Sequence, residues 1–378
     1  MPWYLLVFSL LFVQSAMAEN ISIVGNPTIH HMNGIEHIFA RDSNGHLREW
    51  WRKPKSDWHR EDLSAIFKGR KIAGNPISSA VNGIQHVFAR DINGHLLEWW
   101  WTAKDGWHLE DLTPAGKTII GDPFYYNNHQ GVQYVFAQDS DRNLRVWWWT
   151  PYNTWSSIDL TNIEGLNKHV DGHLAGNPFF AIEQNGTVHV FARNTNGHLI
   201  EWWWTPQNGL HIENLTAVVG GQTIAGDPTI SFYRKHLGAK FYHTHSVYAR
   251  SSNGHLLAWQ WGGYHHKGWK LENLHQMKFK FVDFISNSGE KISGDPKACG
   301  DRKKIFVRDS NNHLKLWKHL SNGWQITDLT AAYGGTTISG NPMPYCYNNQ
   351  TYVVARNSNG YLHHWSLKEN TWLAKEIK

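Results

Sequence analysis

The strongest constraint on the fold is an internal repeat that opens with Gly, then Asn or Asp, then Pro. It occurs seven times in the 378 residues, starting at Gly25, Gly74, Gly121, Gly176, Gly226, Gly294 and Gly340. The pattern that follows is clearest in the second copy, GNPISSAVNGIQHVFARDINGHLLEWWWTAKDGWHLEDLT. Seven copies of a unit of about 50 residues indicate a propeller or a solenoid, in which each unit buries apolar surface against its neighbours.

Within each unit, short apolar runs alternate with a period of two, which is typical of β-strands. In the second copy the pattern predicts strands at 77–81, 84–90, 96–102 and 107–111, separated by Asn-Gly and Asp-Gly turns that favour tight hairpins. No helical period is present, which excludes stacked helix pairs. The prediction is an all-β chain, a seven-bladed β-propeller with four antiparallel strands per blade.

The two ends of the repeat region predict how the ring closes. The seventh unit stops at Lys378 without the linker that ends the other six units, and residues 21–24, before the first Gly, supply a matching segment. We therefore expect residues 19–378 to form a single closed seven-bladed propeller.

The first 18 residues are expected to form a separate segment. Residues 3–13 are apolar, and Ala16-Met17-Ala18 fits the small-residue pattern of signal-peptide cleavage, although no Lys or Arg precedes the apolar stretch. A short membrane anchor is the alternative, but eleven apolar residues are too few to span a bilayer. The prediction is a signal peptide at 1–18 and a secreted, extracellular protein with no membrane span.

Composition excludes several classes of protein. The chain has 22 Trp against 16 Phe and 14 Tyr, which is more Trp than a packed core requires. Its net charge of +5 comes from basic and acidic residues that are mixed along the chain. Nucleic-acid binders concentrate basic residues in a patch, so no nucleic-acid partner is expected. No cofactor motif is present, and homo-oligomerisation is left open.

Two positions of the repeat never change and therefore indicate architecture. A Leu follows the turn between the second and third predicted strands in every unit, and three residues later a Trp is present in all seven. This Trp is Trp50, Trp99, Trp147, Trp202, Trp259, Trp317 and Trp365.

The two positions after the invariant Trp vary, so the fold does not require Trp there. Trp at these positions is expected to contact a ligand, or alternatively to fill the gap between blades. Charged residues nearby would bond sugar hydroxyls while a Trp face stacks on the pyranose C–H face. The candidate carbohydrate-binding residues are Trp51, Trp100, Trp101, Trp148, Trp149, Trp203, Trp204, Trp261, Glu49, Glu98, Glu201, Arg90 and Arg193.

The run VFARDINGHLLEWW resembles the repeat of the PLL-type bacterial lectins, and the resemblance covers all seven units, residues 25–378. It implies a seven-bladed propeller that binds L-fucose or O-methylated sugars, or glycoconjugates that carry them, in pockets between blades. The family's second Trp on the third strand aligns with Trp51, Trp100, Trp148 and Trp203. The sixth and seventh units depart from the family, because Lys318 and Ser366 stand there.

The sequence also bears on three other functions. A glycosidase needs a pair of carboxylates, and we expect such a pair to break the repeat, whereas the acids here mostly recur in every blade as turn or strand-end caps. No catalytic residue is therefore predicted. A metal site is not predicted either, because His243 and His245 could share one strand face but no third ligand is evident. A ring that binds another protein without catalysis remains the main alternative.

Two cysteines, Cys299 and Cys346, fall on the expected first strands of adjacent blades. In an oxidising compartment this placement permits a disulfide if the Cα atoms lie within roughly 7 Å of each other. Two buried free thiols are the alternative.

Overall fold

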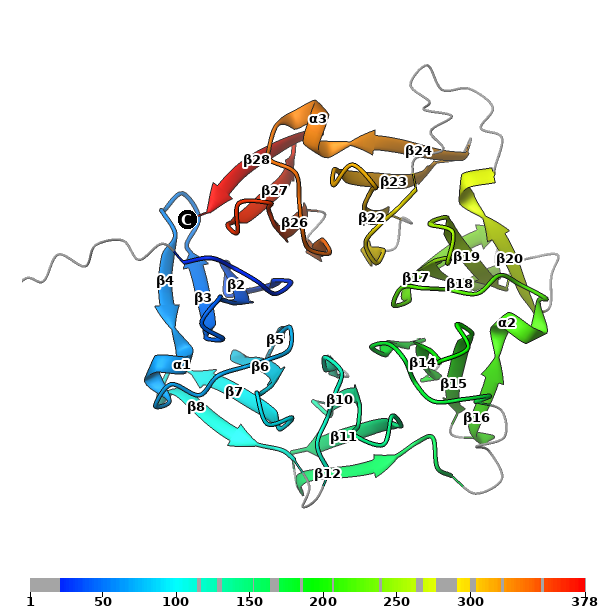
Figure 1. Ribbon diagram of the computed structural model, residues 1–378, viewed down its shortest axis with the longest axis horizontal. Helices are drawn as coiled ribbons and strands as arrows, with labels where there is room; N and C mark the ends of the chain where they lie inside the picture. The colour runs from blue at the N-terminus through cyan, green and yellow to red at the C-terminus, as the bar shows by residue number, and fades with distance from the viewer. Residues whose placement is uncertain are drawn as a thin grey trace, which may run out of the picture.

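The computed structural model describes residues 21–113, 117–127, 131–151, 153–163, 170–183, 186–205, 207–237, 240–262, 268–276, 291–299, 304–320, 323–347 and 350–377. Seven four-stranded antiparallel sheets are arranged in a ring around a central opening (Figure 1). In each sheet the four strands pair in chain order. The chain is therefore a seven-bladed β-propeller, as the repeat predicts.

Each blade consists of four consecutive strands, and the fourth lies on the outside of the ring (Figure 1). Blades 1 to 4 comprise β1 Thr28–Met32, β2 Ile35–Arg41, β3 Leu47–Arg52, β4 His59–Asp62; β5 Ile77–Val81, β6 Ile84–Arg90, β7 Leu96–Thr102, β8 Gly106–Asp111; β9 Phe124–Asn127, β10 Gln133–Gln138, β11 Leu144–Thr150, β12 Asn153–Asp159; β13 Phe179–Ile182, β14 Val188–Arg193, β15 Leu199–Thr205 and β16 Gly209–Asn214. Blades 5 to 7 comprise β17 Thr229–Leu237, β18 Lys240–Arg250, β19 Leu256–Trp261, β20 Trp269–Asn273; β21 Lys297–Cys299, β22 Lys304–Arg308, β23 Leu314–Leu320, β24 Gly323–Asp328; β25 Met343–Tyr347, β26 Gln350–Arg356, β27 Leu362–Lys368 and β28 Thr371–Ile377.

The strands of the second blade agree closely with the sequence pattern. The first three have the predicted bounds, and the fourth begins one residue earlier, because Gly106 already pairs with Thr102. The turn between β5 and β6 places Asn82 and Gly83 at φ 52° and 77°, the left-handed region that this dipeptide favours.

Short helices that the sequence pattern did not predict follow the fourth strand of three blades. They are α1 Leu63–Ile66, α2 Leu215–Val218 and α3 Leu329–Tyr333, and a 3₁₀ turn, η2 Leu274–Gln276, follows β20. Each α-helix begins after an Asp or Asn whose side chain accepts a backbone N–H from the first turn, namely Asp62, Asn214 and Asp328. The recurring acids at the ends of the fourth strands thus include helix caps.

The hydrophobic core lies between blades. One buried cluster joins Phe39, Leu47 and Leu63 of blade 1 to Val87 and Trp99 of blade 2. The same arrangement recurs at each of the other six blade-to-blade contacts. The invariant Trp is at most 4% exposed in every blade, which confirms its architectural role. A single blade therefore has little core of its own.

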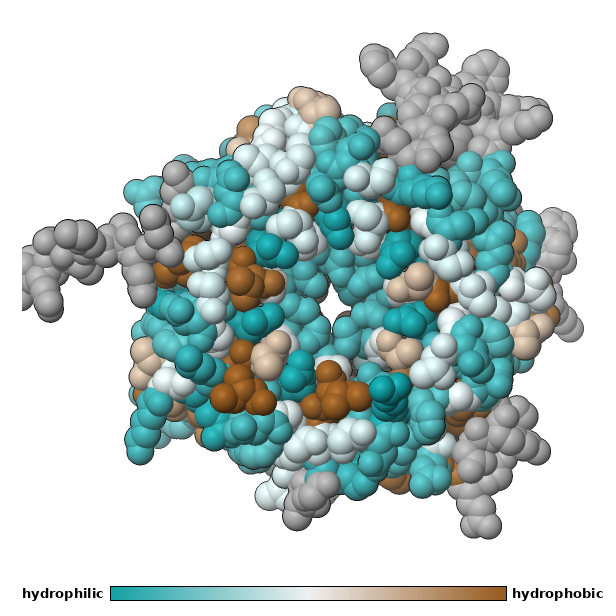
Figure 2. All heavy atoms as spheres, in the orientation of Figure 1, coloured by the Kyte–Doolittle hydropathy of each residue, from teal (hydrophilic) through white to brown (hydrophobic). Residues whose placement is uncertain are grey.

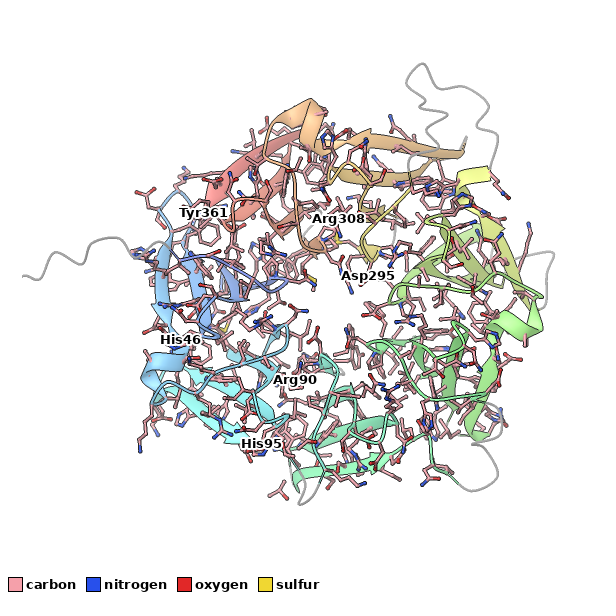
Figure 3. The ribbon with its side chains drawn as sticks, viewed as in Figure 1. His46, Arg90, His95, Asp295, Arg308 and Tyr361 are labelled. Atoms are coloured by element: carbon pink, nitrogen blue, oxygen red, sulfur yellow. A yellow bond between two sulfur atoms is a disulfide. The ribbon has the colours of Figure 1, made fainter. Side chains whose placement is uncertain are left out.

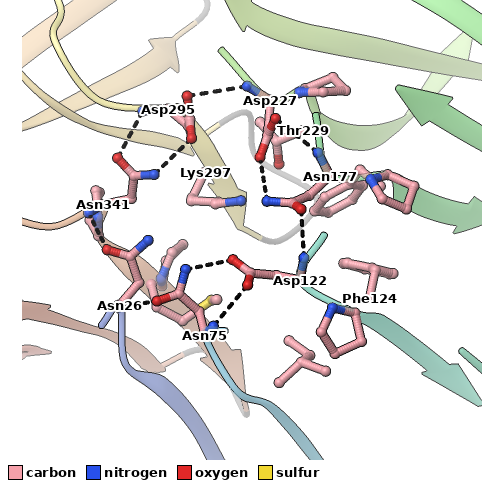
Figure 4. A pocket seen from close by; sticks show the side chains of 18 of the residues that line it. Asn26, Asn75, Asp122, Phe124, Asn177, Asp227, Thr229, Asp295, Lys297 and Asn341 are labelled. Carbon is pink, nitrogen blue, oxygen red and sulfur yellow. Dashed lines mark hydrogen bonds between the residues drawn. The ribbon is translucent and has the colours of Figure 1, made fainter. Parts of the chain in front are cut away.

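A circle of hydrogen bonds around the axis explains why the repeat opens with Asn or Asp. The backbone N–H of this residue in each blade donates to the side-chain Oδ1 of its counterpart in the next, at 2.6 to 3.1 Å (Figure 4). Asn341 closes the circle by donating to Asn26 at 2.9 Å. Only Asn and Asp present an Oδ1. The preceding Gly is also required, since a Cβ at Gly74 would lie 2.6 Å from Oδ1 of Asp122.

Other contacts between blades 7 and 1 complete the closure. The N–H of Ile23 donates to the carbonyl of Gly360 at 2.6 Å, so the segment before the first Gly supplies the linker that the seventh unit lacks. Residues 1–18, where a signal peptide is predicted, lie outside the described residues. Among the described residues, no helix has the length and apolar character needed to cross a membrane.

Cys299 and Cys346 lie on β21 and β25, the innermost strands of blades 6 and 7. The structure joins them in a disulfide, with their Cα atoms 5.9 Å apart. The bond links blade 6 to blade 7, and blade 7 also contacts blade 1 where the ring closes.

Glu36 provides a buried ion pair at the closure between blades 7 and 1. Burial alone would raise the pKa of this carboxyl, but His31, His364 and Arg52 together lower it to about 2. Its folded pKa thus lies below the unfolded value of 4.5, so the stabilisation is present above about pH 4.5 and is lost as the pH falls through 2.

We expect the wild type to lose up to about 3 kcal/mol more stability than Glu36→Gln on acidification from pH 6 to pH 2.5. Urea unfolding of both proteins across this range measures the difference. Equal losses in the two proteins would show that Glu36 does not contribute.

Candidate functional site

Two pockets of the described part of the chain are relevant to a binding site. The axial pocket, about 340 Å³, is lined by the Asn/Asp-Pro circle, whose polar groups already bond to one another (Figure 4). The second pocket, about 520 Å³, lies between blades 4 and 5 and combines three Trp with several His and Glu residues. It contains three of the candidate residues, Trp203, Trp261 and Glu201. We therefore regard this inter-blade pocket as the candidate site.

Blade 4 contributes four side chains that lie on one face of its sheet. His189, Trp203 and His211 stand opposite one another on β14, β15 and β16, and Glu201 precedes Trp203 by two residues on the same face. The rings of Trp203 and His211 stack with centroids 4.0 Å apart. Nδ1 of His189 is 2.7 Å from Oε1 of Glu201. We call these four residues the Trp–His–His–Glu quartet.

The quartet recurs in blades 1 and 2. Trp51 stacks on His59 at 4.3 Å and Trp100 stacks on His108 at 3.9 Å. His37 and His86 each lie 2.7 Å from their glutamates, Glu49 and Glu98. Blade 3 differs: Trp148 stands between Tyr134 and Ser156 in register. The repeat thus builds the quartet in blades 1, 2 and 4, and places Trp148 in different surroundings.

The opposite wall of the pocket comes from blade 5. His245, Trp261 and Trp269 stand opposite one another on β18, β19 and β20. The edge of Trp269 also contacts the ring of Phe191 in blade 4. Successive residues of a strand point to opposite faces, so the second and third Trp of a run line different gaps. Trp203 of blade 4 and Trp261 of blade 5 therefore face each other across one gap.

Corresponding residues stand at the same register positions in blades 2 and 3. Trp101 pairs with Gln85 and Trp107, as Trp261 pairs with His245 and Trp269. Trp149 pairs with Gln133 on β10. Trp107 and Trp155 contact Phe rings of the preceding blade edge-on, as Trp269 does. The gaps after blades 1 and 2 thus share this arrangement.

Trp204, in contrast, is 41% exposed and is not among the residues that line the pocket between blades 4 and 5.

The charged candidate residues divide into two groups. Glu49, Glu98 and Glu201 are buried and bond to the quartet His residues. Arg90 and Arg193 stand at the other end of the second strand, and Arg193 donates to the carbonyl of Ala175 at 2.6 Å. Figure 3 shows Arg90 nearer the central opening than His95. The structure does not bring Arg193 to the Trp203 pocket.

Glu183, His189 and His245 are neighbours in the structure that the repeat pattern does not predict. Their ligand atoms all lie within 4.8 Å of one another. Oε1 of Glu183 is 3.1 Å from Nδ1 of His245 and 3.6 Å from Nε2 of His189. The sequence gives no third ligand for His245, because the neighbouring Glu183 and His189 belong to another blade, more than fifty residues earlier. The side chain of His243 lies outside the described residues.

The charges of this cluster depend on one another. Burial alone would lower the pKa of His189, but Glu183 and Glu201, on either side of its ring, raise it to about 9. His189 and His245 hold the pKa of Glu183 well below its usual range. Burial lowers the pKa of His245. These shifts favour an ionised Glu183 and a protonated His189 at neutral pH.

Figure 2 shows the face around the central opening. Hydrophobic residues there occur in several separate groups, interspersed with hydrophilic ones. The described residues on this face therefore form no single large apolar patch.

One protein family matches two parts of this chain. The family described as "Repeat of unknown function (DUF346)" matches residues 85–124 and 187–230, within blades 2 to 5. The comparison with curated proteins finds no significant match.

Several solved structures are similar at low sequence identity. The SapL1 lectin, solved with alpha methyl fucoside, has 14% identity and a TM-score of 0.45, covering 81% of this chain and 97% of its own. The six-bladed lectin from Aleuria aurantia has 15% identity and a TM-score of 0.47, covering 80% and 94%. AofleA from Arthrobotrys oligospora has 11% identity and a TM-score of 0.47, covering 94% and 87%. At this distance the matches do not determine the ligand of this chain.

Proposed function

We propose that this protein is a multivalent carbohydrate-binding protein, a lectin, that holds a sugar in pockets between adjacent blades. The observation that carries the proposal is the pocket between blades 4 and 5, where Trp203 and Trp261 stand on opposite walls near Glu201. A pyranose has an apolar C–H face that stacks on indole and hydroxyls that bond to charged groups.

The size and lining of the pocket support a small polar ligand. Its volume of about 520 Å³ lies within the roughly 300–1,000 Å³ of small-molecule sites. Trp261 is 40% exposed, so its indole is available for contact. Fucose or an O-methylated sugar is the ligand that the repeat's resemblance favours, because a methyl group would contact the indole rings.

The repeat makes the proposed binding multivalent. The quartet occurs in blades 1, 2 and 4, so we propose three equivalent sites around the ring, with further sites of different lining. Weak sites held at fixed spacing bind a glycan-covered surface much more tightly than one free sugar. The predicted signal peptide would deliver the protein to such surfaces outside the cell.

A glycosidase is a less suitable proposal, although Glu183, Glu201 and Glu213 all line the pocket. The pKa of Glu183 lies well below its usual range, whereas a general acid needs a raised pKa that keeps its proton near neutral pH. Burial raises the pKa of Glu213, but a Glu stands at the same position of the fourth strand in blades 1, 2 and 5, so this acid belongs to the repeat. We therefore propose binding without catalysis.

A glycan array tests the proposal against a protein-binding ring. The purified protein is expected to bind fucosylated or O-methylated glycans more strongly as their printed density increases. Failure to bind any glycan at any density, together with recovery of a protein partner by affinity capture, would favour the protein-binding alternative.

A further inference from the structure

We propose that Glu183, His189 and His245 form a binding site for a divalent transition-metal ion of the zinc class, between blades 4 and 5. The donor set is two imidazoles and one carboxylate, all ligands that zinc accepts. They come from two blades: Glu183 follows β13, His189 lies on β14, and His245 lies on β18. An ion there would join the blades.

The distances suit a tetrahedral ion. Bonds of about 2.0–2.1 Å place the donor atoms roughly 3.3 Å apart. Oε1 of Glu183 lies 3.1 Å from Nδ1 of His245 and 3.6 Å from Nε2 of His189, and no pair of ligand atoms exceeds 4.8 Å. Small side-chain rotations would bring the three atoms to one centre. Three protein donors leave a fourth position, which faces the pocket, for water or another oxygen ligand.

The surroundings of His189 orient it for such a role. Its Nδ1 lies 2.7 Å from Oε1 of Glu201, which leaves Nε2 directed toward Glu183. Carboxylate–His–metal arrangements of this kind fix the imidazole tautomer and strengthen the ligand. His189 and His245 are also largely buried, at 7% and 2% exposure. The charges match as well, since Glu183 and Glu201 together balance one divalent ion.

The other quartets provide an internal comparison. In blade 2, His86 lies 2.7 Å from Glu98, as His189 lies from Glu201. At the position of His245, however, blade 3 carries Gln133, which accepts a hydrogen bond from Tyr125 at 3.0 Å. That gap therefore has a hydrogen-bonded amide where the gap between blades 4 and 5 has a second imidazole. Within the part of the chain that the structure describes, three such ligand atoms come within 4.8 Å of one another in the gap between blades 4 and 5.

The test is equilibrium dialysis of the full chain against Zn²⁺ alone, with the bound metal counted by elemental analysis. We expect about one zinc per chain in the wild type. His245→Gln and Glu183→Gln should each abolish this binding, and Glu201→Gln should weaken it about 10–100-fold. His86→Ala is the matched control and should retain it. Cobalt in place of zinc should give the intense visible bands of a tetrahedral site in the wild type and not in His245→Gln.

Gln stands naturally at the position of His245 in blades 2 and 3, so His245→Gln is expected to fold, and thermal melts verify each variant. If His245→Gln does not fold, Glu183→Gln decides the question. No zinc in the wild type, or the same zinc content in His245→Gln and Glu183→Gln as in the wild type, would overturn the proposal. Because no sugar is present, this result is independent of the glycan proposal.

Discussion

Replacing Trp99 by Ala is expected to destabilise the propeller by about 3–5 kcal/mol, the cost of removing a large buried aromatic side chain. Trp99 is fully buried and packs with Phe39 and Leu63 of the preceding blade. The cavity would therefore open between two blades, where the core of this fold lies. Chemical unfolding with urea measures the loss directly.

Trp204→Ala is the matched control for this experiment, because Trp204 is 41% exposed. Its replacement should change stability by less than about 1 kcal/mol. We also expect each protein to unfold in a single transition, because neighbouring blades share their cores. A Trp99→Ala variant as stable as the wild type would contradict the structural role of the invariant Trp.

Removing Trp203 and Trp261 together is expected to abolish sugar binding in the pocket between blades 4 and 5, with little change in the melting temperature. Aromatic anchors of a binding site each contribute about 2 kcal/mol or more, which corresponds to about a 30-fold loss of affinity per residue. Titration with methyl fucoside, followed by tryptophan fluorescence, measures the loss. Trp204→Ala is the control, since Trp204 is not among the residues that line this pocket.

Binding to a fucosylated surface depends on how many sites of the protein bind at the same time. Loss of one quartet site should reduce binding to a fucosylated surface modestly, because the quartets of blades 1 and 2 remain. Loss of Trp51, Trp100 and Trp203 together should reduce it steeply. If binding to the surface falls equally in the Trp203 variant and in the triple variant, the three sites are not equivalent.

Most of the fold could be predicted from the repeat, because the same pattern of strands and turns recurs in each blade. The strands of the second blade follow from alternation and from the Asn-Gly turns, and their bounds agree with the structure. The short helices α1 to α3 were missed, because they are only four or five residues long and carry no helical period. Their capping residues, in contrast, recur visibly in the sequence.

The candidate site could be predicted only in part. The variable Trp positions identified Trp203 and Trp261, but only strand register shows that they face each other across a gap. The repeat does not predict that Glu183 and His245 lie close together, because they come from different blades and are far apart in the sequence. The strand register also shows that Arg193 lies away from the pocket. Arg193 pairs with Leu199 at one end of β14, whereas His189 lies near the other end.

The most direct test of the account is a methyl fucoside titration of the wild type beside the variant that lacks Trp51, Trp100 and Trp203. The account predicts a saturable fluorescence change in the wild type. In the variant, the saturable change should be much smaller, because only the sites of different lining remain, while its thermal melt stays close to that of the wild type. A variant that melts normally and binds the sugar as tightly as the wild type would show that these tryptophans do not form the site.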